Sequence, residues 1–148
     1  LTSGSKLLHH VIDRVIPILS EHNIHVKKKI EEELPIFVDE EKVIRALTNI
    51  VVNAIRHAEE NILIHAYSEQ KKTIISIEDD GPGVDEELMP HIFHRFIKGK
   101  DGETGLGLAI ARAIIEQSDG KITVSCSPKL GGAKFTITFP VQQMSVKS

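Results

Sequence analysis

The chain has little of several features that define large classes of protein. Cys126 is the only cysteine in its 148 residues, so no internal disulfide can form and a reducing, cytoplasmic location is expected. The longest apolar runs are far too short to span a bilayer, so we expect no direct membrane contact, although a longer parent chain could be membrane-anchored. The net charge of −3 provides no broad basic field, which argues against nucleic acid as a partner.

Two common phosphate-binding signatures are absent as well. No stretch fits the P-loop pattern G-x-x-x-x-G-K-[ST], and the glycines of residues 102–108 (GETGLGL) do not have the Rossmann spacing. No strand pattern immediately precedes these glycines, so a dinucleotide site is not supported. The segment does lead straight into a helical pattern, and backbone N–H groups at a glycine-rich helix N-terminus suit a phosphate group.

The spacing of apolar residues predicts one domain of ordinary soluble composition, with 41% hydrophobic and 26% charged residues. Helices are predicted over residues 6–21, where Pro17 is expected to bend or shorten the helix, from an N-cap at Asp39 through residue 55, and over 106–118. Strands are predicted over residues 24–30, 36–38, 62–67, 73–78, 121–125 and 133–139. The segment before residue 104 reads as irregular, with one or two helical turns at 91–96. This order predicts an α/β fold, a two-layer sandwich with helices on one face of a mixed, mainly antiparallel sheet.

Two asparagines, Asn49 and Asn53, lie within the second predicted helix. Asn is a mediocre helix former because its amide competes for backbone hydrogen bonds. At about 100° per residue, Asn49, Asn53 and Arg56 share one face, roughly opposite the apolar stripe centred near Leu47. That face is either solvated surface or, as Val52 within it indicates, a partly covered surface whose neutral amide oxygens suit a hard cation.

A second pattern is the turn of residues 79–83 (DDGPG), directly after a predicted strand. Two glycines one residue apart permit a tight turn and the close approach of a ligand to the backbone. A turn alone would explain Gly81 and Gly83. Asp is common at turns, but a turn does not require an acid at position 79.

Four motifs in this order resemble the catalytic, ATP-binding domain of sensor histidine kinases, within the wider family that also holds gyrase B, Hsp90, MutL and the anti-sigma-factor kinases. Residues 49–57 (NIVVNAIRH) resemble the family's asparagine box, and residues 79–83 resemble its first glycine box. Residues 92–96 (IFHRF) resemble its phenylalanine box, and residues 105–108 (GLGL) its second glycine box. The resemblance covers nearly the whole chain and implies the Bergerat-type fold, in which ATP lies between the helical layer and a lid.

The resemblance also implies a role for each matching residue. Asn53 would coordinate the Mg²⁺ that bridges the phosphates, and Asn49 would assist in metal binding and catalysis, directly or through water. Arg56, where kinases usually carry Lys, would reach a phosphate, and His57, where an aromatic residue is usual, would lie near the adenine. Asp79 would accept a hydrogen bond from the adenine amino group, which guanine cannot donate.

The glycine boxes and the lid would complete the nucleotide site. Gly81 and Gly83 would let the backbone approach the base, whereas Asp80 replaces the usual Asn, which weakens the case for a role at that position. Arg95 and Lys98 would act in catalysis by meeting the γ-phosphate, or would dock the partner domain, unless they are solvated surface charges. The remaining ATP-binding residues would be Thr104, Gly105, Leu106, Gly107 and Leu108.

On this reading the chain is one half of a kinase. Nothing in it resembles the family's histidine-bearing hairpin, and its first residues contain no Met, so residues 1–148 are expected to be the catalytic and ATP-binding domain of a longer chain. The partners would be the histidine-containing dimerisation domain of that chain and, indirectly, a response regulator. Related ATP hydrolases and serine kinases usually carry a glutamate base where Asn49 stands, and a non-enzymatic nucleotide-binding module is the third alternative. The paired histidines lack the Cys or acidic residues that would complete a zinc site.

Overall fold

The computed structural model describes residues 2–36, 38–83, 87 and 104–140. Its helices are α1 (Gly4–His22), α2 (Glu40–His57) and α3 (Thr104–Gln117). Its strands are β1 (Thr2–Ser3), β2 (His25–Ile30), β3 (Pro35–Ile36), β4 (Asn61–Glu69), β5 (Lys72–Asp79), β6 (Lys121–Cys126) and β7 (Ala133–Pro140). Each predicted helix and strand that falls on the described residues is present, with ends shifted by a few positions. The helical turns predicted at 91–96 lie outside the described residues.

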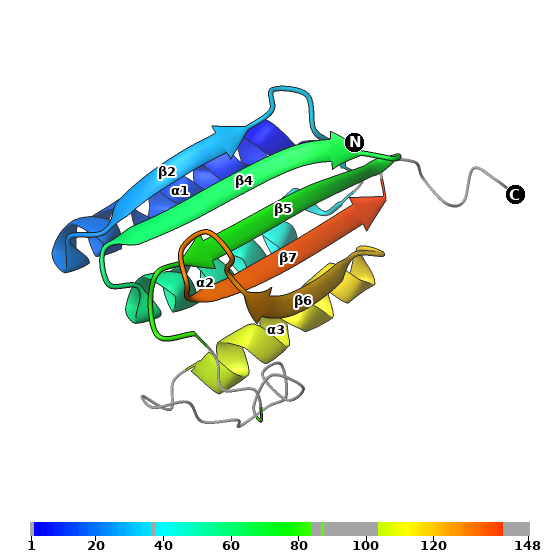
Figure 1. The fold of residues 1–148 in the computed structure, drawn as a ribbon. Helices are drawn as coiled ribbons and strands as arrows, with labels where there is room; N and C mark the ends of the chain where they lie inside the picture. The colour runs from blue at the N-terminus through cyan, green and yellow to red at the C-terminus, as the bar shows by residue number, and fades with distance from the viewer. Residues whose placement is uncertain (1, 37, 84–86, 88–103, 141–148) are drawn as a thin grey trace, which may run out of the picture.

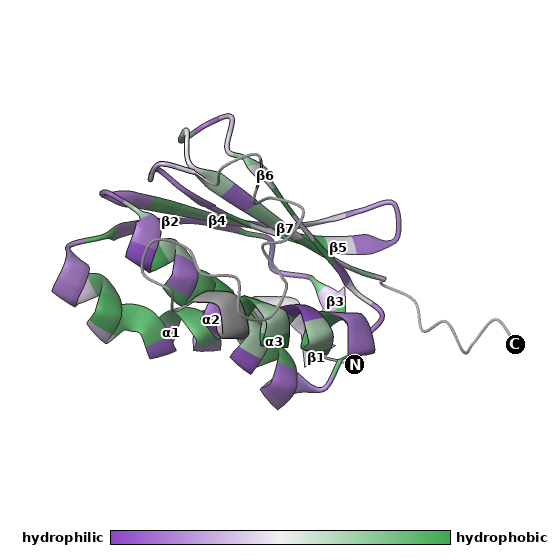
Figure 2. Ribbon diagram, turned by 90° about the horizontal axis from the view of Figure 1, so that it is seen from below, coloured by the Kyte–Doolittle hydropathy of each residue, from purple (hydrophilic) through white to green (hydrophobic). Residues whose placement is uncertain are grey.

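Five of these strands form one mixed sheet in the order β2-β4-β5-β7-β6. Strand β2 runs parallel to β4, and the other neighbours are antiparallel, including the two predicted hairpins β4–β5 and β6–β7. Strands β1 and β3 form a separate two-stranded sheet. Figures 1 and 2 show α1, α2 and α3 together on one face of the larger sheet. The predicted two-layer α/β sandwich is therefore confirmed.

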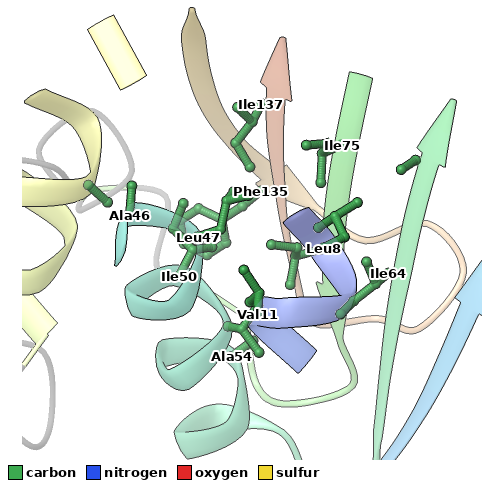
Figure 3. Packing of buried hydrophobic residues seen from close by; sticks show 14 of the residues in the cluster. Leu8, Val11, Ala46, Leu47, Ile50, Ala54, Ile64, Ile75, Phe135 and Ile137 are labelled. Atoms are coloured by element: carbon green, nitrogen blue, oxygen red, sulfur yellow. The ribbon is translucent and has the colours of Figure 1, made fainter. Parts of the chain in front are cut away.

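The hydrophobic core lies between the helices and that face of the sheet. Helix α2 is central, because it packs against α1, α3 and β5. On β7, buried side chains alternate with half-buried ones, as expected of a strand with one covered face. Figure 3 shows the apolar side chains that the two layers contribute, among them Leu8, Val11, Leu47, Ile50, Ile64, Ile75, Phe135 and Ile137.

Helix α1 continues past Pro17 to His22, so the proline does not shorten it. Val15 is buried before Pro17, and Leu19 packs against the core after it. The burial of apolar side chains on both sides outweighs the one helical hydrogen bond that a proline removes. None of the described helices, α1 included, combines the length and the hydropathy that crossing a bilayer requires.

Candidate functional site

The part of the α2 surface that carries Asn49 and Asn53 turns toward α3 and is not solvated surface. Asn53 is 7% exposed, and Asn49 is half-buried, with its Nδ2 donating a long hydrogen bond of 3.4 Å to the Gly107 carbonyl oxygen of α3. The Asn53 amide has no hydrogen-bond partner among the described residues. Of the two sequence interpretations, the structure therefore favours the covered face. A buried amide that lacks a partner within the described chain suits a bound cation or its water shell.

Asp79 ends β5 on the side of the sheet where α2 also ends. Its carboxylate is 1% exposed, and its Oδ1 accepts hydrogen bonds from the N–H groups of Gly81 at 2.9 Å and Ala133 at 3.3 Å. Burial raises the pKa of Asp79, and these two N–H groups oppose the rise only in part. Within the described residues Oδ2 has no hydrogen-bond partner. One oxygen is thus fixed by the fold, and the other could accept a further hydrogen bond.

Two glycines leave room for this carboxylate. A Cβ on Gly132 would overlap Asp79 Oδ1, and a Cβ on Gly81 would overlap the carbonyl oxygen of His57 at the end of α2. Gly83 has a φ of +82°, a conformation that favours glycine. The absence of a side chain at 81 therefore has a packing reason within the fold, in addition to the approach to a base inferred from the sequence.

The turn between β6 and β7 brings Gly132 and Ala133 to Asp79, and the sequence reasoning did not identify what holds this turn. The Gly132 N–H donates to the Asp79 carbonyl oxygen at 3.1 Å. Behind it, the Ser127 hydroxyl donates to the buried Glu78 carboxylate at 2.6 Å and accepts from the Leu130 N–H at 2.9 Å. Glu78 and Asp79 are adjacent on β5, and they fix the same turn from opposite faces of the sheet.

Asp80, for which the sequence analysis found no role, accepts several hydrogen bonds. Its Oδ1 accepts from the N–H groups of Glu59 at 2.8 Å and Glu60 at 3.1 Å. Its Oδ2 accepts from Glu60 N at 3.2 Å, Asn61 N at 3.0 Å and Asn61 Nδ2 at 3.2 Å. Burial alone would raise the pKa of Asp80, but these donors outweigh it and hold the pKa below its ordinary value. The carboxylate fastens the turn after β5 to the loop that joins α2 to β4.

The remaining candidates fall at the ends of α2 and α3. Arg56 is exposed and His57 half-buried in the last turn of α2. Leu108 is 1% exposed and packs in the core, so only its backbone is left for a ligand. A Cβ on Gly107 would meet no described atom within 4 Å, so no described side chain fills the space beside this residue of α3. Thr104, Gly105 and Leu106 belong to those turns, whereas Arg95 and Lys98 lie outside the described residues.

Within the described part of the chain, no group of three or more His, Cys, Asp or Glu side chains could hold a metal ion. The groups here that could face a hard cation are amide oxygens, those of Asn53 and Asn49. Mg²⁺ usually takes few protein ligands and completes its shell with water and substrate phosphates, so this sparse set fits the ion.

Residues 38–143 match the family described as histidine kinase-, DNA gyrase B- and HSP90-like ATPases, and the chain belongs to this family. The sensory histidine kinase/phosphatase NtrB of Vibrio alginolyticus is 31% identical over 152 residues, which cover 90% of this chain and 43% of that protein. The chain thus spans less than half the length of this curated relative. The resemblance found in the sequence motifs is confirmed at the level of the family.

Solved structures agree with this assignment. The catalytic domain of the histidine kinase ThkA, solved without nucleotide, gives a TM-score of 0.84 at 29% identity, covering 94% of this chain and 93% of that one. Full-length ShkA, solved in complex with AMPPNP, gives a TM-score of 0.81 at 29% identity, covering 94% of this chain and 30% of that one. The fold is thus that of histidine kinase catalytic domains, and the roles of individual residues stay predictions.

Proposed function

We propose that residues 1–148 are the catalytic, ATP-binding domain of a sensor histidine kinase. The domain binds Mg-ATP and transfers the γ-phosphate to a histidine on a separate dimerisation domain of the same kinase, from which a response regulator is then phosphorylated. The observation that carries this proposal is the buried Asp79, which has one oxygen held by two backbone N–H groups and the other without a described partner. Such a carboxylate is oriented in advance to accept one hydrogen bond.

The orientation of Asp79 favours adenine. Its Oδ2 accepts a hydrogen bond from the exocyclic amino group of the base. Guanine presents a carbonyl oxygen at the corresponding position, so a buried carboxylate and that oxygen would face each other with no proton between them. Gly81 and Gly83 keep the turn beside the base free of side chains.

The phosphates lie along the asparagine face of α2 and the first turns of α3. Asn53, assisted by Asn49, offers amide oxygens to Mg²⁺, which neutralises charge on the phosphates when bound. The N–H groups at the start of α3 and the space beside Gly107, which no described side chain fills, suit the phosphate chain. Arg56 reaches a phosphate from the end of α2, and Arg95 and Lys98 are proposed to meet the γ-phosphate or the partner domain.

The residue types favour a histidine as phosphate acceptor over water or serine. Water and serine need a base to remove a proton, and Asn49 stands where related hydrolases carry one. A neutral imidazole is already a nucleophile, so positioning and charge stabilisation are sufficient for transfer. An ATP hydrolase, a serine kinase and a non-enzymatic nucleotide-binding module remain the competing functions.

Calorimetric titration of the chain with Mg-ATP, Mg-GTP and ATP in the presence of EDTA tests the binding part of this proposal. We expect Mg-ATP to bind at least about a hundredfold more tightly than Mg-GTP, because the unmatched carboxylate rejects guanine. Chelation of Mg²⁺ should weaken ATP binding. Equal affinity for the two nucleotides would contradict the role of Asp79, and no binding of either would contradict the proposed function.

A further inference from the structure

The two halves of the proposed ATP site lie on different elements. Asp79, for the base, ends β5, whereas Asn53, for the metal ion, lies on α2. A nucleotide must meet both at once, so its affinity depends on their separation and relative orientation. Near the base, α2 and β5 meet where the loop after α2 approaches the turn after β5.

The Asp80 carboxylate forms the polar part of this junction. The loop from α2 to β4 directs three successive backbone N–H groups at it, from Glu59, Glu60 and Asn61, with N···O distances between 2.8 and 3.2 Å. On its other side the loop is held by the N–H of His25, which donates to the Glu60 carbonyl oxygen at 2.8 Å. The loop is therefore fixed from β2 and from the turn after β5.

The Asp80 backbone connects this junction directly to Asp79. The carbonyl group of Asp80 and the N–H of Gly81 belong to one planar peptide unit, and that N–H donates to Asp79 Oδ1 at 2.9 Å. The next contact is steric, since Gly81 packs directly on the carbonyl oxygen of His57. Movement of residue 80 relative to the loop would therefore rotate the N–H that orients the base-binding carboxylate.

We infer that Asp80 is a positioning residue for ATP recognition, because it fixes the orientation of Asp79 relative to the nucleotide face of α2. This inference rests on the proposed function and deepens it. Asp80 itself touches the loop and not the nucleotide. Its removal should weaken the recognition of adenine more than it weakens general nucleotide binding, because the misplaced group is the one that distinguishes the bases.

A carboxylate suits this junction better than an amide, because every partner is a donor. Substitutions at Asp80 can therefore remove acceptors in steps. Asp80→Asn keeps one acceptor oxygen for Glu59 and Glu60 but directs an NH₂ group at Asn61, which also donates. Asp80→Ala removes both acceptors. Asp13→Ala removes an exposed aspartate on α1 and is the matched control. Asn61→Ala removes only one side-chain donor and leaves the backbone donors in place.

The test is the affinity of the 148-residue chain and its variants for Mg-ATP and Mg-GTP, measured by calorimetry well below each variant's unfolding midpoint. For Asp80→Ala we expect the affinity for Mg-ATP to fall about tenfold or more, with little change in the affinity for Mg-GTP. Misalignment of Asp79 would weaken its charged hydrogen bond to adenine, and the loss of such a bond lowers affinity by about that factor. Asp80→Asn should lie between Asp80→Ala and wild type. Asp13→Ala should match wild type, and Asn61→Ala should change the affinity by about twofold at most.

The ratio of the two affinities separates positioning from a purely structural role. If Asp80 only stabilises the fold, Asp80→Ala and Asp80→Asn will have lower melting temperatures but an unchanged ATP-to-GTP ratio in the folded protein, and the inference is overturned. Should Asp80→Ala not fold, the ratio for Asp80→Asn decides the question by the same criterion. If wild type binds no Mg-ATP, the proposed function fails, and the inference fails with it for that separate reason.

Discussion

The Asp79 side chain is buried by the fold, whereas its proposed role in adenine recognition requires a charged carboxylate. Burial raises its pKa even though the N–H groups of Gly81 and Ala133 oppose the rise. When the folded-state pKa exceeds the unfolded value of about 3.9, the folded chain binds the proton more tightly. Stability then falls as the pH rises from the unfolded pKa through the folded pKa, and the whole penalty persists at neutral pH.

Asp79→Asn should therefore fold as well as wild type at pH 7, or better, and bind Mg-ATP at least about tenfold more weakly. The amide keeps an acceptor for Gly81 and Ala133, removes the buried charge and presents NH₂ to the adenine amino group. Denaturant unfolding across the acid range should show the stability gap closing as the pH falls below the unfolded pKa. A variant that is clearly less stable at pH 7, or one with wild-type affinity, would contradict this account.

The sequence pointed to some of the candidate residues and not to others for a physical reason. Asn53 and Asp79 were recognisable because their side chains are unusual for a helix interior and unnecessary for a turn. Asp80 was given no weight, because most of its partners are backbone N–H groups 19 to 21 positions earlier in the chain. Backbone donors leave no mark in the sequence, so only the folded structure could show this junction.

At the scale of elements, a substitution at the start of α3 can distinguish an effect on helix stability from an effect on ligand binding. Gly107 lies within the helix, and a Cβ there would meet no described atom within 4 Å. Glycine is a poor residue in a helix relative to alanine, by about 1 kcal/mol. Neither packing against the described residues nor helix propensity explains a glycine here, whereas the close approach of a phosphate would explain it.

Gly107→Ala should accordingly stabilise the chain by about 0.5–1 kcal/mol and weaken the binding of Mg-ATP. Thermal and denaturant unfolding measure the first effect, and calorimetry measures the second. Gly132→Ala is the contrasting variant, because its Cβ would overlap Asp79 Oδ1 and should lower both stability and affinity. If Gly107→Ala binds Mg-ATP as tightly as wild type does, the start of α3 does not hold the phosphates closely.

The elements themselves were largely predictable, because apolar spacing reports which face of each one is buried. What covers the polar face of α2 was not predictable, since a helical wheel identifies a face but not its neighbour. The structure places α3 there, through the contact between Asn49 and the Gly107 carbonyl oxygen. The short pairing of β1 with β3 was missed as well, since two residues are too few for any alternation to show.

At the scale of the whole molecule, one parallel strand pair explains how the asparagine-bearing helix is held. Strands β2 and β4 are parallel, so the chain must cross over between them, and α2 lies within that connection. The crossover lays α2 on the sheet between α1 and α3, with its end beside the turn after β5. The sequence predicted a mixed sheet with helices on one face, but this crossover depends on pairings between distant strands that periodicity does not encode.

The proposed site has groups for the base, the metal ion and the phosphates, but no described segment resembles the family's histidine acceptor. Positioned nucleotide alone does not produce transfer, because the nucleophile must also be aligned. We therefore predict that the chain alone binds Mg-ATP as a monomer, hydrolyses it very slowly and does not label itself. Addition of the dimeric histidine hairpin from its parent kinase should yield phosphohistidine, stable in base and labile in acid.

Radiolabelled ATP is the probe, with Asp79→Asn as the binding-deficient control. Strong labelling of the chain alone on any of its eight histidines would contradict the division of labour, and tight ATP binding without hairpin labelling would favour the non-enzymatic module.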